Sequence, residues 1–225
     1  MTTPIHPAAG FESLPVTTAF LGRTPDVNVA TDRTTALANL APYHTIALAR
    51  CGLDSIPLVT AEQVHGDTVT VVHSPTLPFF HLGCDALITN LSDICLGIYV
   101  ADCAAVWLYD PVRRVIGLVH SGKKGTELGI VPKAIASMNR EYGCLASDIV
   151  ASISPCIRPP HYEVDFAATI RAQLADSGVS QIHDKKICTF ANPAEYYSYR
   201  RERGLTGRML ALLAQNSDSN IAAAK

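Results

Sequence analysis

Residues 94–120 read ICLGIYVADCAAVWLYDPVRRVIGLVH and contain three apolar runs, at 94–100, 104–109 and 115–120. Each run is nearly uninterrupted and rich in Val, Ile and Leu, which is typical of strands that are covered on both faces. The turn Asp110-Pro111 separates the second run from the third. This stretch therefore predicts three buried strands and a sheet that lies inside the molecule.

Outward from this stretch, strands are expected on both sides, and helices mainly after it. Short apolar or alternating segments predict strands at residues 16–21, 45–49, 58–60, 68–72, 85–89, 149–153 and 186–190. Helical spacing of apolar residues predicts helices at 28–40, 128–142 and 166–177. Asn192-Pro193, as N-cap and first-turn proline, predicts a last helix that continues towards residue 213, and residues 216–225 are expected to fray.

The order of these elements indicates the fold class. Strands cluster in the middle and helices concentrate later, without strict alternation, so we expect an α+β fold, a layered α/β sandwich with mixed β-sheets, rather than a doubly wound sheet. A length of 225 residues suits one large domain better than two. No internal repeat or low-complexity linker divides the chain, which predicts a single domain over residues 1–225.

Composition excludes several classes of partner. The net charge of −2 is spread without a basic stripe, so we expect no nucleic-acid partner. The longest apolar run, around residues 94–106, contains Asp102 and is too short to span a bilayer, so we expect no membrane partner. The beginning of the sequence lacks a basic segment followed by an apolar one, which favours a cytoplasmic protein. Monomer and homodimer both remain open.

The seven cysteines favour a reducing compartment. Their number is odd and no CxxC pair occurs, which is not the pattern of a disulfide framework. Several lie in apolar surroundings, where a reduced cysteine behaves as a small hydrophobic residue. For any one of them, packing in the core is the simplest interpretation.

Three reactive side chains stand where a predicted strand meets a turn: His65, Cys103 and His120. Two imidazoles and one thiolate suit Zn²⁺, and three protein ligands leave a fourth position open, as in catalytic zinc sites. Without a metal, the same residues would make a cysteine nucleophile with a histidine base. Taken singly, each histidine is more often a hydrogen-bonded structural residue, and Cys103 a core residue. The residue types alone leave these alternatives open.

Charged residues near the trio have two interpretations each. Asp102 lies between two apolar strands and must find a partner or face a cleft. Residues 122–126, GKKGT, precede a predicted helix and suit either an anion-binding turn or a solvent-exposed one. For residues 199–201 and Arg208, near the predicted last helix, a solvated helical face is the default expectation.

Taken in order, the motifs resemble the YfiH-like, laccase-domain family, whose members are also called multicopper polyphenol oxidase-type proteins, purine nucleoside phosphorylases or peptidoglycan editing factors. The resemblance covers most of the chain from about residue 29. It is carried by QVHG at 63–66, DALIT at 85–89, ADC at 101–103 with DP at 110–111, HSG at 120–122 with GT at 125–126, SPCI at 154–157 with YEV at 162–164, and YRR at 199–201 with TGRM at 206–209.

The resemblance implies one zinc per chain, at the positions of His65, Cys103 and His120. It implies mixed sheets similar to cysteine-hydrolase-like folds. It also implies phosphorolysis of adenosine, inosine or methylthioadenosine and deamination of adenosine, with a nucleoside and phosphate as small-molecule partners. Copper is not expected, because one CysHis₂ set lacks the further histidines that several coppers require.

This sequence departs from the family at the rim of the expected site. The family usually has His-Ala-Gly-Trp-Arg-Gly where residues 120–125 here read HSGKKG. A lysine offers charge to a phosphate but lacks the bidentate fork of arginine.

We therefore assign expected roles as follows. We expect catalytic roles for Cys103, His65, His120 and Asp102. Asp102 would orient groups or shuttle protons. We expect Gln63, Lys124 and Arg208 to contact the substrate. The alternatives are a Cys-His amidohydrolase acting on a peptidoglycan precursor, and a non-catalytic relative that keeps zinc for stability.

Overall fold

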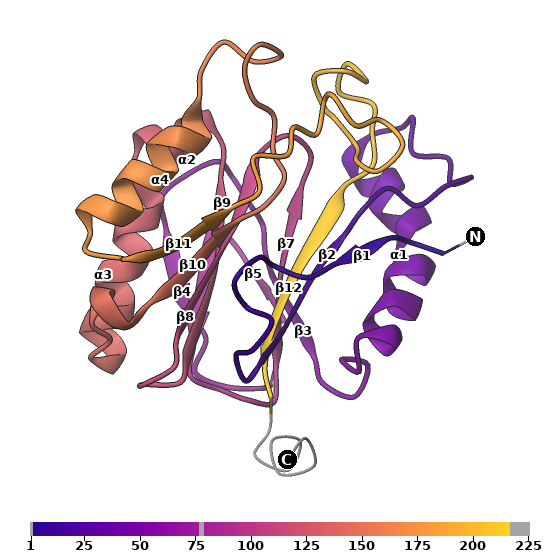
Figure 1. Cartoon of the computed structure of the whole chain (residues 1–225). Helices are drawn as coiled ribbons and strands as arrows, with labels where there is room; N and C mark the ends of the chain where they lie inside the picture. The colour runs from indigo at the N-terminus through magenta and orange to yellow at the C-terminus, as the bar shows by residue number, and fades with distance from the viewer. Residues whose placement is uncertain (1, 77–78, 217–225) are drawn as a thin grey trace.

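Two mixed six-stranded sheets face each other, and helices cover their outer faces (Figure 1). The computed structural model describes residues 2–76 and 79–216. The expected α+β layered sandwich with mixed sheets is confirmed.

Of the helices within the described residues, none has both the length and the apolar character needed to cross a bilayer. Of residues 216–225, which were expected to fray, all but the first lie outside the described residues.

The first sheet has the order β1-β2-β12-β7-β3-β5. The pairs from β1 to β7 are antiparallel, and β3 runs parallel to both β7 and β5. Its strands are β1 (Ile5–His6), β2 (Val16–Leu21), β3 (Leu58–Ala61), β5 (Phe80–His81), β7 (Cys95–Val100) and β12 (Met209–Gln215).

The second sheet has the order β11-β10-β8-β9-β6-β4. Its two outermost pairs are parallel and its inner pairs are antiparallel. Its strands are β4 (Val69–Val71), β6 (Ala86–Thr89), β8 (Ala104–Asp110), β9 (Val115–Ser121), β10 (Val150–Ile153) and β11 (Gln181–Asp184). Every residue of β8 and β9 is buried, as the apolar runs predicted.

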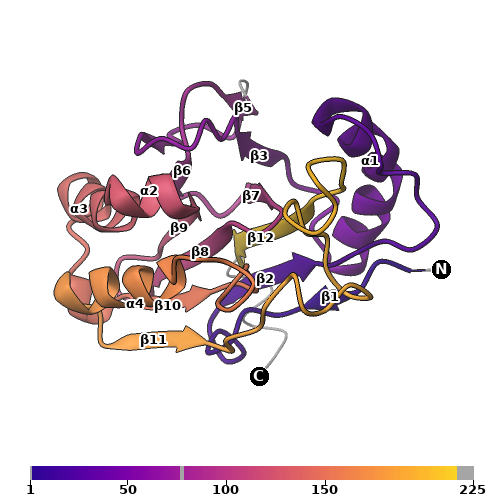
Figure 2. The same cartoon turned by 90° about the horizontal axis from the view of Figure 1, so that it is seen from above.

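The helices form the two outer layers (Figures 1 and 2). Helix α1 (Arg33–Arg50) packs on the first sheet, whereas α2, α3 and α4 lie on the side of the second sheet. These three helices are α2 (Lys123–Glu127), α3 (Ile130–Tyr142) and α4 (Phe166–Asp176), and a 3₁₀ turn, Ala146–Asp148, follows α3.

The period of two along each strand divides the core into layers. In β12, Met209, Ala211 and Leu213 face the core between the sheets, while the alternate residues face α1. Trp107 of β8 lies in the same central core and donates from Nε1 to the carbonyl of Leu212 at 2.9 Å. This hydrogen bond joins the two sheets directly.

The predicted last helix is wrong. Residues 209–215 form β12, which pairs with β2 on one side and β7 on the other, and all seven residues are buried. The sequence MLALLAQ consists of good helix formers, but pairing between two strands outweighs local propensity. Residues 185–208, which precede it, form a long irregular segment.

Three other expected elements also differ. The strand expected at 186–190 lies earlier, at β11. The strand expected at 45–49 belongs to α1, which starts later than expected and continues through Pro42. Ala36, Leu40, His44 and Ala47 are buried along one face of α1, and this continuous face outweighs the lost proline hydrogen bond.

Trp107→Phe should lower the free energy of unfolding by about 2–4 kcal/mol, because it removes the bond between the sheets and leaves a void in a close-packed core. Denaturant unfolding followed by circular dichroism measures the change. The control is Leu82→Ala, whose side chain is 74 % exposed, and it should shift the value by less than about 0.5 kcal/mol. Equal effects of the two substitutions would show that Trp107 does not join the sheets.

Candidate metal centre

His65, Cys103 and His120 meet at one end of the two sheets. Their ligand atoms all lie within 4.8 Å of one another. The two histidine rings meet edge to face, with centroids 4.9 Å apart. Bonds from one zinc ion to such ligands are about 2.0–2.3 Å long, so small side-chain rotations suffice for the three residues to share one ion.

Strand β9 delivers His120, and the turn after it makes room for the thiol. His120 N donates to the carbonyl of Asp85 at 2.7 Å, which extends the pairing of β9 with β6 to the end of the strand. A Cβ atom at Gly122 would lie 2.5 Å from Cys103 Sγ. A side chain at position 122 is therefore excluded while the thiol keeps its place.

The buried carboxylate of Asp85 holds both histidines. Oδ1 accepts from His65 N at 2.9 Å and from His120 Nδ1 at 2.7 Å, while Oδ2 accepts from Val64 N at 3.1 Å and Gly66 N at 2.8 Å. Burial raises the pKa of Asp85, but the bonds from His120 and the backbone of residues 65–66 outweigh it and leave the pKa lowered. Because His120 Nδ1 donates to Asp85, Nε2 is the nitrogen left for a metal.

The loop that carries His65 has an uncommon backbone. Gln63 and His65 have φ values of 65° and 60°, in the left-handed region that side chains other than glycine rarely adopt. Gln63 also closes a ring with Tyr99, donating from Nε2 to its carbonyl at 2.5 Å and accepting from its N–H at 2.9 Å. Asp85 and the backbone of β7 together fix this strained loop.

Cys103 and His120 form a charged pair in the metal-free site. Burial raises the pKa of the Cys103 thiol, but His120 and His65 outweigh it and lower that pKa to about 6. Burial likewise opposes protonation of His120, while Cys103 and Asp85 raise its pKa to about 9. The thiolate is the form of cysteine that binds a metal or attacks an electrophile.

Asp102 has partners rather than a free carboxylate. Its side chain accepts from Thr189 Oγ1 at 2.7 Å, Ser198 Oγ at 3.0 Å and Arg200 N at 2.7 Å. Its own carbonyl accepts from Ile157 N at 2.8 Å. Asp102 thus ties the segment 185–208 to the turn that carries the thiol, and this use of its lone pairs favours an orienting role.

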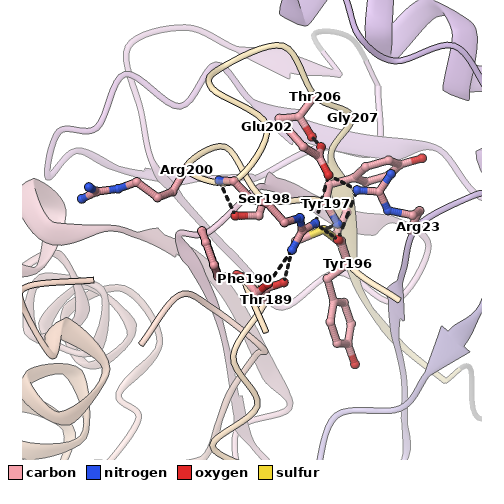
Figure 3. Close-up of polar contacts among 12 residues, drawn as sticks. Arg23, Thr189, Phe190, Tyr196, Tyr197, Ser198, Arg200, Glu202, Thr206 and Gly207 are labelled. Carbon is pink, nitrogen blue, oxygen red and sulfur yellow. Dashed lines mark hydrogen bonds and ion pairs between the residues drawn. The ribbon is translucent and has the colours of Figure 1, made fainter. Parts of the chain in front are cut away.

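The segment 185–208 is held by half-buried charged side chains rather than by regular structure (Figure 3). Arg201 donates to the carbonyls of Thr189, Phe190 and Tyr196, at 2.7–2.9 Å, and pairs with Glu202 at 2.9 Å. Glu202 also pairs with Arg23. The expected helical face at residues 199–201 and Arg208 is therefore wrong, because all of them lie in this irregular segment, and Arg201 is not solvated either.

A cavity of about 650 Å³ opens onto the trio and contains all four of the other predicted site residues. Gln63, Asp102, Lys124 and Arg208 line it. Cationic and aromatic side chains that sequence reasoning had not assigned to the site also line the cavity: Arg33, Lys123, Arg200, Tyr99, Tyr162, Phe166 and Tyr199.

Asp85 was missed as a site residue, although a signal was present. It directly precedes a strand of four buried residues, β6, and is itself fully buried. Like Asp102, Asp85 is a carboxylate beside an apolar strand and therefore needs a partner.

Fold and cluster together define a two-sheet sandwich with a His-Cys-His set in the lining of a cationic cavity. A family model described as multi-copper polyphenol oxidoreductase laccase matches residues 22–166 and 163–216. The chain belongs to this laccase-domain, YfiH-like family, as its motifs predicted.

Relatives and solved structures agree with this assignment. Purine nucleoside phosphorylase ORF3 of Streptomyces griseus is 32% identical over 190 residues, covering 72% of this chain and 76% of the relative. A purine nucleoside phosphorylase of Deinococcus radiodurans is 30% identical over 246 residues, covering 95% and 94%. The crystal structure of YlmD from Geobacillus stearothermophilus shares the fold, with a TM-score of 0.80 at 23% identity over 91% of this chain and 93% of that one.

Asp85→Asn should weaken zinc binding about 10–100-fold, because it removes the charge that orients His120 and the loop of His65. Competition with a chromophoric chelator measures the affinity, and circular dichroism checks the fold. Asp93→Asn, at an exposed position, is the matched control and should bind zinc like the parent. Unchanged affinity in Asp85→Asn would contradict the assigned role.

In the metal-free protein, Cys103 should react with iodoacetamide at a rate that rises with pH around a midpoint near 6, where its pKa lies. Above that pH the thiolate predominates, and as the pH falls through 6 it takes up a proton and loses reactivity. The pKa of an ordinary cysteine thiol is about 8.5. Mass spectrometry of the alkylated peptide follows the rate, and Cys103→Ser should abolish the phase with the low midpoint. A midpoint above about 8 would refute the charged pair.

Proposed function

We propose that the protein is a zinc-dependent purine nucleoside enzyme that cleaves adenosine, inosine or methylthioadenosine by phosphorolysis. The observation that carries the proposal is the cluster of His65, Cys103 and His120 in the lining of a cavity that cations and aromatic rings also line. The names of the relatives support the reaction class, and membership of the family supports a metal.

The donor set fits one zinc per chain better than several coppers. Two imidazole nitrogens and one thiolate are ligands that zinc prefers, and a set of three leaves a position open to substrate or water. Copper clusters need more histidines than this cluster offers. When bound, zinc would supply a Lewis acid that polarises the group under attack.

The lining residues divide the work of binding. Tyr162 and Phe166, whose rings meet edge to face at 5.9 Å, offer apolar surface for a purine. Lys124 and Arg208 offer positive charge to anionic groups of the substrates. Gln63 and Asp102, with side chains engaged by neighbouring residues, act by holding the loops that form the cavity.

In phosphorolysis, a phosphate oxygen forms a bond to C1′ of the ribose as the bond from C1′ to the purine nitrogen breaks. The purine leaves with the electron pair of that bond and takes up a proton, and ribose 1-phosphate remains. Residues that hold phosphate and nucleoside in line supply the orientation that such a displacement needs. Adenosine deamination is part of the proposal: the oxygen of a water molecule forms a bond to the purine C6, the bond from C6 to the amino nitrogen breaks, and ammonia leaves, so that inosine remains.

A Cys-His amidohydrolase is the second candidate. The lowered pKa of Cys103, about 6, and the adjacent His120 are the observation that favours it, because a thiolate beside an imidazolium is an activated nucleophile. In that case zinc would inhibit rather than support the activity.

Zinc-loaded protein should convert at least one of adenosine, inosine and methylthioadenosine to its base and a ribose 1-phosphate, or a 5-methylthioribose 1-phosphate, only when phosphate is present. Chromatography of the products measures this, and inosine formed from adenosine without phosphate reports deamination. Cys103→Ala should lose both zinc and activity, while Cys51→Ala, at the end of α1, should keep both.

The alternatives predict other results. No turnover of any nucleoside by fully loaded protein would refute the proposal and favour a non-catalytic role for zinc. Trapping of an acyl group on Cys103, with activity that survives chelation, would favour the amidohydrolase.

A further inference from the structure

Two arginines from segments far apart in the sequence line the cavity. Arg33 is the first residue of α1, and Arg208 immediately precedes β12. Lys123 and Lys124 line the same cavity from α2. In Figures 1 and 2, α1 and the segment leading into β12 lie on one side and α2 lies on the other. The cavity is therefore lined by a pair of arginines and a pair of lysines that come from different elements of the fold.

Neither arginine pairs with a carboxylate among residues 2–76 and 79–216. Arg33 donates to the carbonyl of Glu62 at 3.1 Å, and the Glu62 carboxylate is occupied with Gly83 N at 2.7 Å. Arg208 donates to the carbonyls of Thr206 and Gly207 at 2.8 and 3.0 Å. Carbonyl oxygens fix the direction of a guanidinium but do not neutralise its charge.

Arg200, on the same cavity, provides the contrast. It pairs with Glu163 at 2.7 Å and lies over the Tyr162 ring, with its guanidinium carbon 5.0 Å from the centroid. Its charge is compensated within the protein. Arg33 and Arg208 differ from it in having no such partner in the described part of the chain.

The two unpaired charges act on each other. Burial and then Arg33 lower the pKa of Arg208, and Tyr199, Cys103 and Asp102 oppose the shift. A guanidinium does not give up its proton near neutral pH, so the repulsion is not relieved by ionisation. An anion bound between the two side chains would relieve it.

We propose that Arg33 and Arg208 form a phosphate-binding subsite, separate from the lysine pair of α2, in the cavity that faces the metal trio. Each guanidinium is a planar fork that suits two phosphate oxygens, and two such forks match a tetrahedral dianion. The guanidinium carbon of Arg208 lies over the Tyr199 ring, 5.9 Å from its centroid, and this cation–π contact helps to hold the Arg208 side chain in place.

The phosphate has two possible sources. One is inorganic phosphate, the co-substrate of the proposed phosphorolysis. The other is a phosphate ester on the ribose, in which case the lysine pair would take inorganic phosphate and purine nucleoside monophosphates would join the substrates. The inference rests on the proposed function for its meaning, but binding can be measured without turnover.

Calorimetry with zinc-loaded protein tests the subsite, using inorganic phosphate and inosine 5′-monophosphate as separate probes. Arg33→Gln and Arg208→Gln should each lower the affinity for at least one probe about 10–100-fold, as expected for a lost charged hydrogen bond. Arg171→Gln, on the exposed surface of α4, removes the same charge elsewhere and should change neither affinity. Thermal unfolding confirms that the variants fold, and Arg33→Lys, which keeps the charge without the fork, should fall between parent and Arg33→Gln.

The two probes identify the source. Weaker binding of inorganic phosphate by the arginine variants assigns the subsite to the co-substrate. Weaker binding of inosine 5′-monophosphate alone assigns it to a phosphate ester. Parent-like binding of both probes by both arginine variants overturns the proposal, as does failure of the parent to bind either probe. Intact binding without nucleoside turnover would count against the proposed function and leave the subsite standing.

Discussion

The carboxylate of Asp85 is the contact on which the candidate metal centre depends. It accepts four hydrogen bonds, three from the backbone of residues 64–66 and one from His120. A buried carboxylate is costly unless its lone pairs are satisfied, and the donors that satisfy this one belong to the two segments that carry the histidines. Its own position is fixed, because its carbonyl accepts from His120 N and its N–H donates to Thr68. The same contact therefore satisfies a buried charge and aligns two candidate metal ligands.

A second buried carboxylate, Asp102, plays the matching part for the thiol and lines the cavity itself. Asp102 lies directly before Cys103 and collects donors from Thr189, Ser198 and Arg200. Arg201 and Glu202 then hold the rest of segment 185–208. An irregular segment of this length can keep a defined cavity shape because its polar groups are bound from within.

Sequence reasoning predicted the parts of the molecule whose information is local. The runs within 94–120 form β7, β8 and β9 as predicted, because consecutive apolar residues indicate a strand that is buried on both faces. Strand β12 was missed because MLALLAQ has no β-branched residue and owes its conformation to β2 and β7. The trio was found through ordered motifs, and its ligand role stays a prediction. Asp85 was missed because its partners lie 19 to 35 positions away in the sequence, a separation that no periodicity reveals.

Strand β12 also bears on how the protein is made. It lies between β2 and β7, so one sheet has a gap at its centre until residue 215 has been synthesised. Until then the facing edges of β2 and β7 carry unpaired backbone groups beside apolar surface, the combination that invites wrong pairing in nascent chains. On the ribosome, the second sheet, whose last strand ends at Asp184, is available first. We therefore infer a vectorial order in which the sheet bearing His120 precedes the sheet that closes the molecule.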